Sequence, residues 1–372
     1  MTLAQRLPAS LTPLDVALAD LLSGLEPLAA IELPLGEALG CVAAELPPLE
    51  AYPSCNVAAT DGWALSARDL AGASSYTPVP VRGRGHWVEA GDKLPDGCDC
   101  VIDLDSVDQS GPIFHVLAEA IPGQGVRRAG GHFPDGFRFR RGSPVRPVDI
   151  FGARVAGLDK IKVRRPKLRL VNVPSIRSEI GTARLIQESA RCAGVEVVTA
   201  EASSRAPNSV AEAVGDTACD LIITIGGSGV GRTDATIIAL AQRGEVVAHG
   251  IALRPGTTSA IARIGNIPVI SLSGLTEHAL AGWWTLALPA LDRLSAHQPR
   301  QTAVLPLTRK LASSVGIAEI ALLGRKDNSW DPLALGDLTF ETIVSANAWL
   351  TVPASSEGFA AGTPVTAYIL RE

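Results

Sequence analysis

Aromatic residues make up only 4% of this chain of 372 residues, so its hydrophobic cores must consist of Leu, Val, Ile and Ala. The chain also lacks a basic excess, because its formal net charge is −5. That balance argues against a general role in nucleic-acid binding, which favours a basic surface stripe. No run reaches the roughly 20 apolar residues that cross a bilayer, and the first residues lack the apolar segment of a secretory signal. We therefore expect a cytoplasmic protein with no membrane span and no nucleic-acid partner.

The six cysteines do not have the spacing of a zinc site. Cys98 and Cys100 lie in a strand-like run without a second Cys or His pair at zinc spacing, so we expect buried free thiols in a reduced protein. Two basic clusters, at 138–141 and 160–167, are interrupted by apolar residues at strand period. This pattern predicts solvent-facing strands, and the alternative is a rim that attracts anions.

The length exceeds the roughly 250–300 residues at which a single core stops growing, and the 36 Gly and 26 Pro indicate many turns. We divide the chain into four regions. Residues 1–46 with 143–165 form a linker and helical domain, and residues 47–142 form a β-rich insertion domain. Residues 166–298 form an α/β domain, and residues 299–372 form a small C-terminal β-domain.

The hydrophobic periodicity changes between these regions. Residues 12–28 carry an apolar stripe at helical spacing, with Thr12 as N-cap, and a second short helix is expected after Pro34. Short strand-like runs between Gly, Pro and Asp turns, among them 137–139, fill the insertion. From residue 166 onward, apolar strands alternate with amphipathic helices, which indicates a doubly wound parallel sheet flanked by helices.

The strongest local signal for a site is a glycine-rich loop that follows the apolar run 221–225. Its candidate residues are Gly226, Gly227, Ser228, Gly229 and Gly231. Such glycines let backbone N–H groups approach a ligand, and the helix expected next adds positive partial charge, which suits a phosphate or another anion. Asp234 lies near that helix start, where it could cap the helix or hold a metal. The loop is neither a Walker A loop nor a spaced G-x-G-x-x-G, so a tight turn without a ligand is the alternative.

Three further segments, 53–64, 90–102 and 253–258, are unremarkable alone. In their order, however, they resemble the signature of the MoeA/gephyrin family of molybdopterin molybdenumtransferases over nearly the whole chain. CNVAATDGWALSARDL is similar to the family's FDNSAMDGYAV segment, and GDKLPDGCDCVI to its GAPLPxGADAVV. DLIITIGGSGVGRTD resembles D-x-I-x-T-x-GG-x-S-x-GxxD, and RPG resembles the KPGKP turn.

The resemblance implies both a fold and a reaction. The fold is a multidomain α/β protein: a MogA-like doubly wound domain, a β-rich insertion, an elongated N-terminal helical segment and a small C-terminal β-domain. The reaction is the insertion of molybdate into molybdopterin or its adenylate, assisted by Mg²⁺, in a homodimer.

The resemblance also implies roles for single residues. Asp61 and Asp234 match catalytic positions, and Asp61, Asp105 and Asp234 are the implied metal ligands. The glycine loop, Arg254 and Gly256 are the implied substrate-binding residues, with Arg232 as a further candidate.

Departures from the family pattern keep other functions open. The Ser of the family's GG-x-S-x-G is Gly229 here, and its Ser-Thr-Gly-Asp-Glu-Leu turn is replaced by 172–176, near which Ser175, Ser178 or Glu179 could substitute. These losses favour, as an alternative, a catalytically impaired molybdopterin-binding, nucleotide-binding or assembly protein on the same scaffold. A weaker alternative is a binder of another nucleotide through the glycine loop alone.

Overall fold

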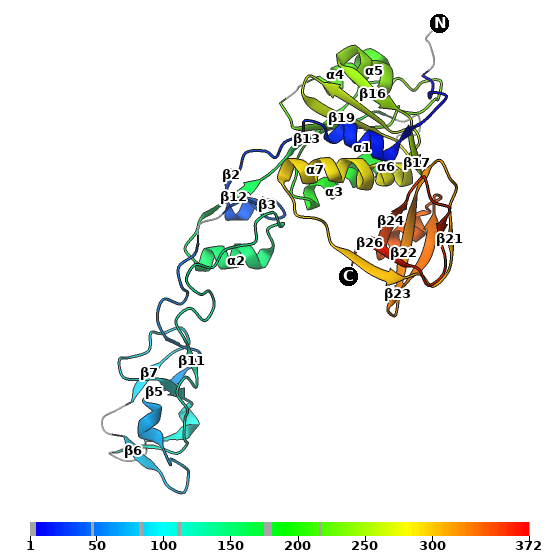
Figure 1. The fold of residues 1–372 in the computed structure, drawn as a ribbon. Coiled ribbons are helices and arrows are strands. Elements are labelled where there is room, and N and C mark those ends of the chain that lie inside the picture. The colour runs from blue at the N-terminus through cyan, green and yellow to red at the C-terminus, as the bar shows by residue number, and fades with distance from the viewer. Residues whose placement is uncertain are drawn as a thin grey trace. The chain divides into compact units, whose positions relative to one another are not determined.

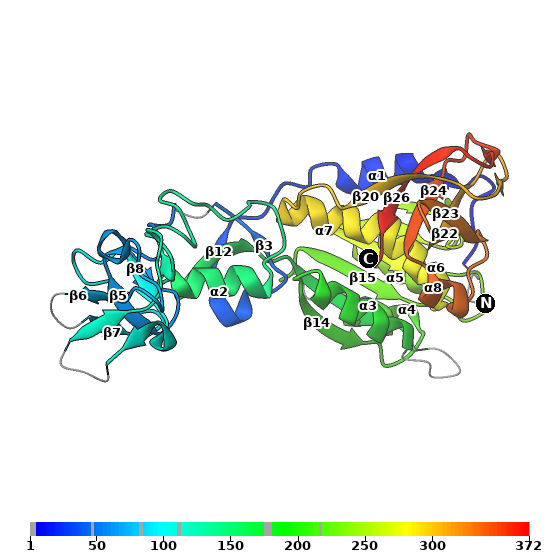
Figure 2. The ribbon, with the colours of Figure 1, turned by 90° about the horizontal axis from the view of Figure 1, so that it is seen from below.

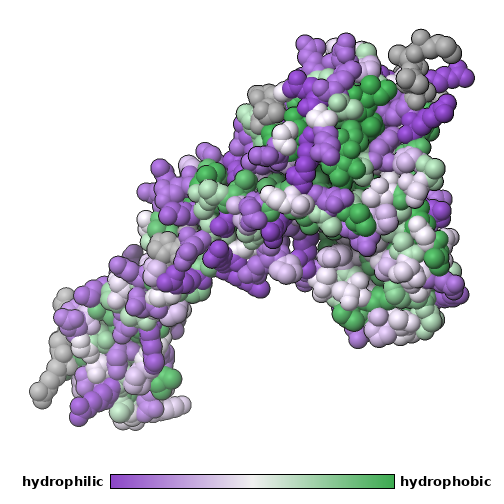
Figure 3. Space-filling view, turned by 45° about the horizontal axis from the view of Figure 1, so that its top comes forward, coloured by the Kyte–Doolittle hydropathy of each residue, from purple (hydrophilic) through white to green (hydrophobic). Residues whose placement is uncertain are grey.

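The structure, a computed structural model, describes residues 5–45, 48–81, 85–109, 113–174, 181–215 and 218–371 (Figure 1). The chain forms two compact units. Unit 1 comprises Met1–Ala44, Arg141–Pro147 and Lys160–Glu372, and unit 2 comprises Glu45–Arg140 and Val148–Asp159. No described helix is long and apolar enough to cross a membrane, and hydrophilic side chains are spread over the face that Figure 3 shows. The division into four domains stays a prediction.

Unit 2 is β-rich, as its many turns predict. In one antiparallel sheet β5 (Gly62–Leu65) lies between β7 (His86–Val88) and β8 (Cys100–Ile102). In another, β10 (Phe114–Val116) lies between β6 (Val79–Val81) and β9 (Val107–Asp108), and β4 (Val57–Ala58) pairs with β11 (Val126–Arg127). The 3-10 helices Ala67–Leu70 and Leu104–Ser106 and most of helix α2 (Pro147–Val155) complete the unit.

Two sequence predictions in unit 2 need correction. The run 137–139 is not a strand: Phe137 forms one isolated bridge with Leu49, and its ring packs between those of Phe133 and Phe139. The packing of the three aromatic rings, rather than a continuous strand ladder, therefore holds this segment in place. Of the two neighbouring cysteines, both free thiols, Cys100 is buried as expected, but Cys98 is half-buried.

The α/β part of unit 1 is a six-stranded sheet in the order β14-β13-β15-β19-β18-β16. Its strands are β13 (Lys167–Asn172), β14 (Glu196–Glu201), β15 (Leu221–Ile225), β16 (Glu245–His249), β18 (Ala260–Ile264) and β19 (Ile267–Leu272). The first four strands in this order are parallel. β18 is antiparallel to both of its neighbours, β19 and β16, so β16 runs in the same direction as the first four. The doubly wound sheet is confirmed, but it is mixed, because the two-residue Gly-Asn turn between β18 and β19 can only join antiparallel strands.

Helices cover both faces of this sheet (Figure 2). One face packs against α1 (Leu14–Leu22), α3 (Gly181–Cys192), α6 (Thr276–Gly282) and α7 (Leu288–Ser295), with a π-helical turn at Trp283–Ala287 between the last two. The other face packs against α4 (Pro207–Val214) and α5 (Thr236–Arg243). Alternate residues of β13 point to the two cores, Leu168 and Leu170 to one and Val171 to the other, as a strand buried on both faces requires.

The predicted N-terminal helices are partly wrong. Thr12 is not an N-cap: it lies in β1 (Thr12–Pro13), its N–H donates to Gly250 O at 2.9 Å, and the helix begins at Leu14 without a side-chain cap. The helix expected after Pro34 is only a 3-10 turn, Leu35–Glu37. Strand pairing overrides helix propensity here, because β2 (Ile31–Pro34) and β3 (Val42–Ala43) both pair with β12 (Lys160–Arg164). On β12 exposed lysines alternate with buried Ile161 and Val163, as the basic pattern predicted.

The C-terminal β-structure is confirmed, and its sheet recruits strands from earlier in the chain. The order is β1-β17-β22-β24-β26-β20, with β23 also paired to β22. The bounds are β17 (Ile251–Arg254), β20 (Thr302–Pro306), β22 (Ala318–Lys326), β23 (Ser329–Leu335), β24 (Ala348–Val352) and β26 (Pro364–Ile369). A small pair, β21 (Leu311–Ala312) with β25 (Gly358–Phe359), and helix α8 (Phe340–Ser345) complete it. β17 lies in sequence between β16 and β18 of the α/β sheet but pairs within the C-terminal sheet, so it connects the two sheets.

Candidate functional site

The glycine loop lies where the α/β sheet changes its direction of winding. The chain leaves β13 through α3 to β14 on one side, whereas β15 pairs on the other side of β13. Open α/β sheets bind ligands in the crevice at the carboxyl ends of strands at such a point. Three loops meet there, because Val173 N donates to Ile225 O and Gly226 N donates to Leu272 O, both at 2.9 Å.

The conformation of the loop requires glycine at two positions. Gly226 and Gly227 have φ angles of +95° and +70°, in the region that side-chain-bearing residues rarely adopt. A Cβ on Gly227 would also lie 2.3 Å from Thr236 Oγ1, at the start of α5. That hydroxyl donates to Gly226 O at 2.9 Å, and Thr236 N donates to Gly227 O at 3.1 Å. Thr236, at the start of α5, therefore holds the carbonyl groups of Gly226 and Gly227.

Two further side chains, which the sequence reasoning missed, hold the carbonyl groups of the loop. Buried Gln5 donates from Nε2 to Gly227 O at 3.2 Å and to Gly229 O at 2.5 Å, and its Oε1 accepts from Ile237 N at 3.0 Å. His249 Nε2 donates to the carbonyl of Ser228 at 3.0 Å. No local pattern marks either residue, because both reach the loop from distant parts of the sequence.

Three consecutive N–H groups of the loop, unlike the carbonyl groups of the same residues, have no hydrogen-bond partner among the described residues. Among the described residues, none accepts a hydrogen bond from the N–H groups of Gly227, Ser228 or Gly229. The Ser228 hydroxyl is buried and likewise has no partner within the described part of the chain. Buried polar groups are nearly always hydrogen-bonded, so these groups favour a polar ligand or water at the loop.

Asp234 does not cap α5, whose N-cap is Ala235. Its Oδ2 accepts from Gly231 N at 2.8 Å, and its Oδ1 accepts from Nη2 of Arg205. A Cβ added to Gly229 would lie 2.6 Å from Asp234 Oδ2, so glycine at this position makes room for the carboxylate. The sequence predicted Asp234 as a site residue but gave no sign of Arg205 as its partner.

One of the three carboxylates expected to hold a metal, Asp234, does not fit that role in the described residues. Both oxygens of Asp234 are already engaged, one of them by a guanidinium. Asp61 and Asp105 belong to unit 2, where both are exposed, and Asp61 Oδ1 accepts from Ala90 N at 2.7 Å, as a turn residue would. Across the described ranges, no cluster of three or more His, Cys, Asp or Glu side chains is placed to hold a metal ion. Ser175, Ser178 and Glu179, named as substitutes, lie outside the described residues.

Arg254, the expected anion-binding residue, ends β17 and is ion-paired. Its Nη1 donates to Glu319 Oε1 at 3.0 Å, while half of its own side chain (50%) stays exposed. Burial is the largest influence on the pKa of Glu319 and raises it, but hydrogen bonds from Ser313 and Ser314 and the charge of Arg254 together outweigh it, so the pKa is lowered. Gly256 follows with φ +119°, where a Cβ would lie 3.4 Å from the carbonyl oxygen of His278.

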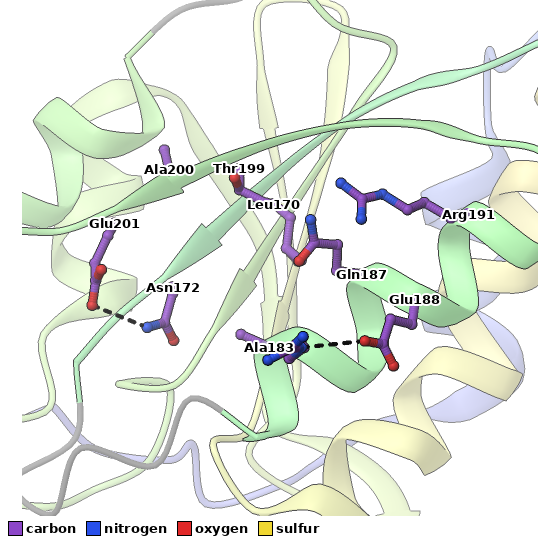
Figure 4. Close-up of a pocket in the computed structure, with 10 residues that line it drawn as sticks. Leu170, Asn172, Ala183, Gln187, Glu188, Arg191, Thr199, Ala200 and Glu201 are labelled. Atoms are coloured by element: carbon purple, nitrogen blue, oxygen red, sulfur yellow. Dashed lines mark hydrogen bonds and ion pairs between the residues drawn. The ribbon is translucent and has the colours of Figure 1, made fainter.

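A polar groove of about 530 Å³ lies beside β13 and β14 (Figure 4). Its lining comes from three elements: Leu170 and Asn172 of β13, residues 199–201 of β14, and polar side chains of α3. Within it, Asn172 Nδ2 donates to Glu201 Oε1 at 3.3 Å, and Arg184 pairs with Glu188 at 3.3 Å. Charges of both signs line this groove, so it carries no selective signal for an anion.

Comparison with known proteins supports this reading of the fold. Residues 12–157 match the family described as "MoeA N-terminal region (domain I and II)", and residues 181–293 match the "probable molybdopterin binding domain". Molybdopterin molybdenumtransferase 2 of Mycobacterium tuberculosis is 27% identical over 394 residues, covering 91% of this chain and 95% of that protein. The molybdopterin molybdenumtransferase of Haemophilus influenzae is 25% identical over 318 residues, covering 75% and 78%.

A solved structure agrees in fold. The molybdopterin biosynthesis moeA protein of Pyrococcus horikoshii superimposes with a TM-score of 0.69 at 21% identity, covering 97% of this chain and 100% of that one. The matches and the fold together define an MoeA N-terminal region joined to a doubly wound α/β domain of the molybdopterin-binding type. The chain belongs to the MoeA family, as its sequence motifs indicated.

Proposed function

We propose that this protein acts in molybdenum cofactor biosynthesis: it binds molybdopterin or its adenylate and inserts molybdenum supplied as molybdate. The main support is the loop 226–231, whose carbonyl groups are tied back while N–H groups remain for an anion. This loop lies within the match to the probable molybdopterin binding domain. Two relatives that cover most of the chain are molybdopterin molybdenumtransferases.

In this proposal each site residue has a separate task. The backbone N–H groups of Gly227 and Gly229 and the Ser228 hydroxyl bind oxygen atoms of the ligand. Arg254, half of whose side chain is exposed, is the proposed cationic contact, and Gly256 sets the turn beside it.

The carboxylates have the remaining tasks. Asp61, Asp105 and Asp234 are the family-matched acids, and Asp61 and Asp234 are each proposed as catalytic residues. The resemblance also implies Mg²⁺, but the engaged oxygens of Asp234 do not fit a metal ligand, so no step is assigned to the ion.

A turnover assay tests the proposed reaction. The protein, incubated with adenylylated molybdopterin and molybdate, with and without Mg²⁺, should release AMP and form molybdenum cofactor. No AMP release at stoichiometric protein concentration would refute molybdenum transfer. The implied homodimer is tested in the same preparation by sedimentation equilibrium, where a monomer mass at micromolar concentration would refute it.

One observation favours a second candidate, a cytoplasmic binding or assembly protein that does not catalyse transfer. Asp234, a proposed catalytic acid, is occupied by Arg205 and Gly231 rather than free to act on a substrate. This candidate predicts pterin binding without AMP release, and an Asp61→Asn variant with almost unchanged affinity. Expression in a molybdotransferase-deficient strain separates the two, because only the transferase restores molybdoenzyme activity.

A further inference from the structure

Arg205 connects two of the three loops at the site. It lies between the end of β14 and the start of α4, and its Nη1 donates to Pro174 O at 2.8 Å, in the loop after β13. Its Nε donates to Thr233 O at 3.4 Å, and its Nη2 binds Asp234 Oδ1, both in the loop after β15. Two backbone carbonyls therefore fix the guanidinium independently of the carboxylate.

The resulting ion pair is largely shielded from solvent. The side chains of Arg205 and Asp234 are 21% and 14% exposed. The other Asp234 oxygen accepts from Gly231 N at 2.8 Å, so neither oxygen faces the loop without a partner. A divalent cation held by Asp234 would lie against one of its carboxylate oxygens, with further oxygen ligands in near-octahedral geometry. Here the guanidinium already holds that position, and its positive charge repels a second cation.

We propose that Arg205 supplies the positive charge that a divalent cation would supply beside Asp234, so that the loop 226–231 binds an oxyanion or phosphate group without Mg²⁺. A guanidinium has five N–H groups, and the three contacts above leave one on Nη1 and one on Nη2. Paired N–H groups of arginine match two phosphate oxygens, which a lysine cannot reproduce. The inference rests on the proposed function only for the identity of the anion.

Metal binding is the first test, with Mn²⁺ as the probe for Mg²⁺ and electron paramagnetic resonance of free Mn²⁺ as the readout on the full chain. Wild type and Asp234→Asn should bind Mn²⁺ equally weakly. Arg205→Gln, which frees Asp234, should gain one site at least tenfold tighter, and the double variant Arg205→Gln with Asp234→Asn should lose it again. A wild-type Mn²⁺ site that Asp234→Asn abolishes overturns the proposal, and so does an Arg205→Gln variant with no gain.

Anion binding is the second test, with inorganic phosphate and calorimetry in EDTA. Wild type should bind phosphate, Arg205→Gln at least tenfold more weakly, and Arg205→Lys in between, and Mg²⁺ should leave the wild-type affinity unchanged. Affinity that appears only with Mg²⁺, or full affinity in Arg205→Gln, overturns the proposal. A purely structural brace would lower thermal stability in Arg205→Gln without creating the Mn²⁺ site.

The two arms separate this inference from the proposed function. Phosphate binding that appears only with Mg²⁺ overturns this inference but leaves the proposed function standing. Wild type that binds no phosphate either in EDTA or with Mg²⁺ removes the loop as an anion site, and with it the proposed function. The Mn²⁺ comparison decides by itself whether Arg205 takes the place of the cation. Circular dichroism and melting of each variant establish that the binding differences come from folded protein.

Discussion

Replacement of Glu319 tests how much its buried carboxylate contributes to the stability of the C-terminal sheet. Glu319 lies on β22, next to β17, and its side chain is only 5% exposed. It accepts from Arg254 Nη1 at 3.0 Å, from Ser313 Oγ at 2.6 Å and from Ser314 N at 3.1 Å. The carboxylate thus links two strands and the loop before β22.

The expected loss follows from the number and charge of these contacts. A hydrogen bond to a charged group contributes about 1.5–3 kcal/mol, and a buried donor left unpaired costs about 1–3 kcal/mol. Glu319→Gln keeps the shape and some of the bonds, so we expect the free energy of unfolding to fall by about 1–2 kcal/mol. Glu319→Ala leaves Ser314 N unpaired, and we expect a fall of about 3 kcal/mol. Because half of Arg254 is exposed, water can solvate its charge, and the larger penalty of a buried unpaired ion should not apply.

The pH dependence has a definite sign. The pKa of Glu319 is lowered in the folded protein from its ordinary value of 4.5, because its hydrogen bonds and Arg254 outweigh the opposing effect of burial. A lowered folded pKa stabilises the protein fully above the unfolded pKa, and this stabilisation is lost as the pH falls through the folded pKa. The difference in free energy of unfolding between wild type and Glu319→Gln should therefore stay constant near neutral pH and become smaller below pH 4.5.

Urea unfolding followed by tryptophan fluorescence measures this difference, because Trp330 and Trp349 are buried in the C-terminal part of the chain. Glu357→Gln, at an exposed glutamate in the segment between β24 and β25, is the matched control and should leave stability unchanged. A Glu319→Gln variant as stable as wild type at pH 7 would refute the reasoning, as would a difference of the same size at pH 7 and pH 4.

Three further results are expected. Gln5→Ala removes three hydrogen bonds to the glycine loop and to α5, so unit 1 should lose about 2 kcal/mol and amides 226–237 should exchange faster by mass spectrometry; unchanged exchange would contradict the bracing role. Gly194→Ala, at φ +74° with a Cβ only 2.1 Å from a backbone oxygen, should cost more than the about 1–3 kcal/mol of backbone strain alone. Gly24→Ala, in the same unit at φ +72° with open space around the Cβ, should show the strain alone, and equal losses of melting temperature would refute the clash. Burial, with a smaller effect of neighbouring Asp99, raises the pKa of the Cys100 thiol to about 11. At pH 8, N-ethylmaleimide should therefore label exposed Cys192 but not Cys100. Peptide mapping that finds Cys100 labelled in the folded protein would contradict this.

The sequence determined those features that arise from local periodicity and turn chemistry. Apolar strands alternating with amphipathic helices from residue 166 onward were enough to predict the doubly wound sheet. The glycines of 226–231 marked the loop at its edge, because positive φ and close packing exclude other side chains at Gly226 and Gly227. The ordered motifs identified the family, since such motifs are written in contiguous residues.

Only the tertiary structure decided the partners of the site residues. Gln5 lies 232 positions from the amide of Ile237 that it binds, and Arg254 lies 65 positions from Glu319. Thr12 has a helical sequence context, yet its N–H is taken by Gly250 O of a distant segment. Local sequence patterns indicate the conformation that a residue favours. Its hydrogen-bond and ion-pair partners depend on which distant segments the fold brings together. The same reason explains why the sequence marks the glycine loop as a candidate anion site but gives no sign that Arg205 pairs with Asp234 beside it.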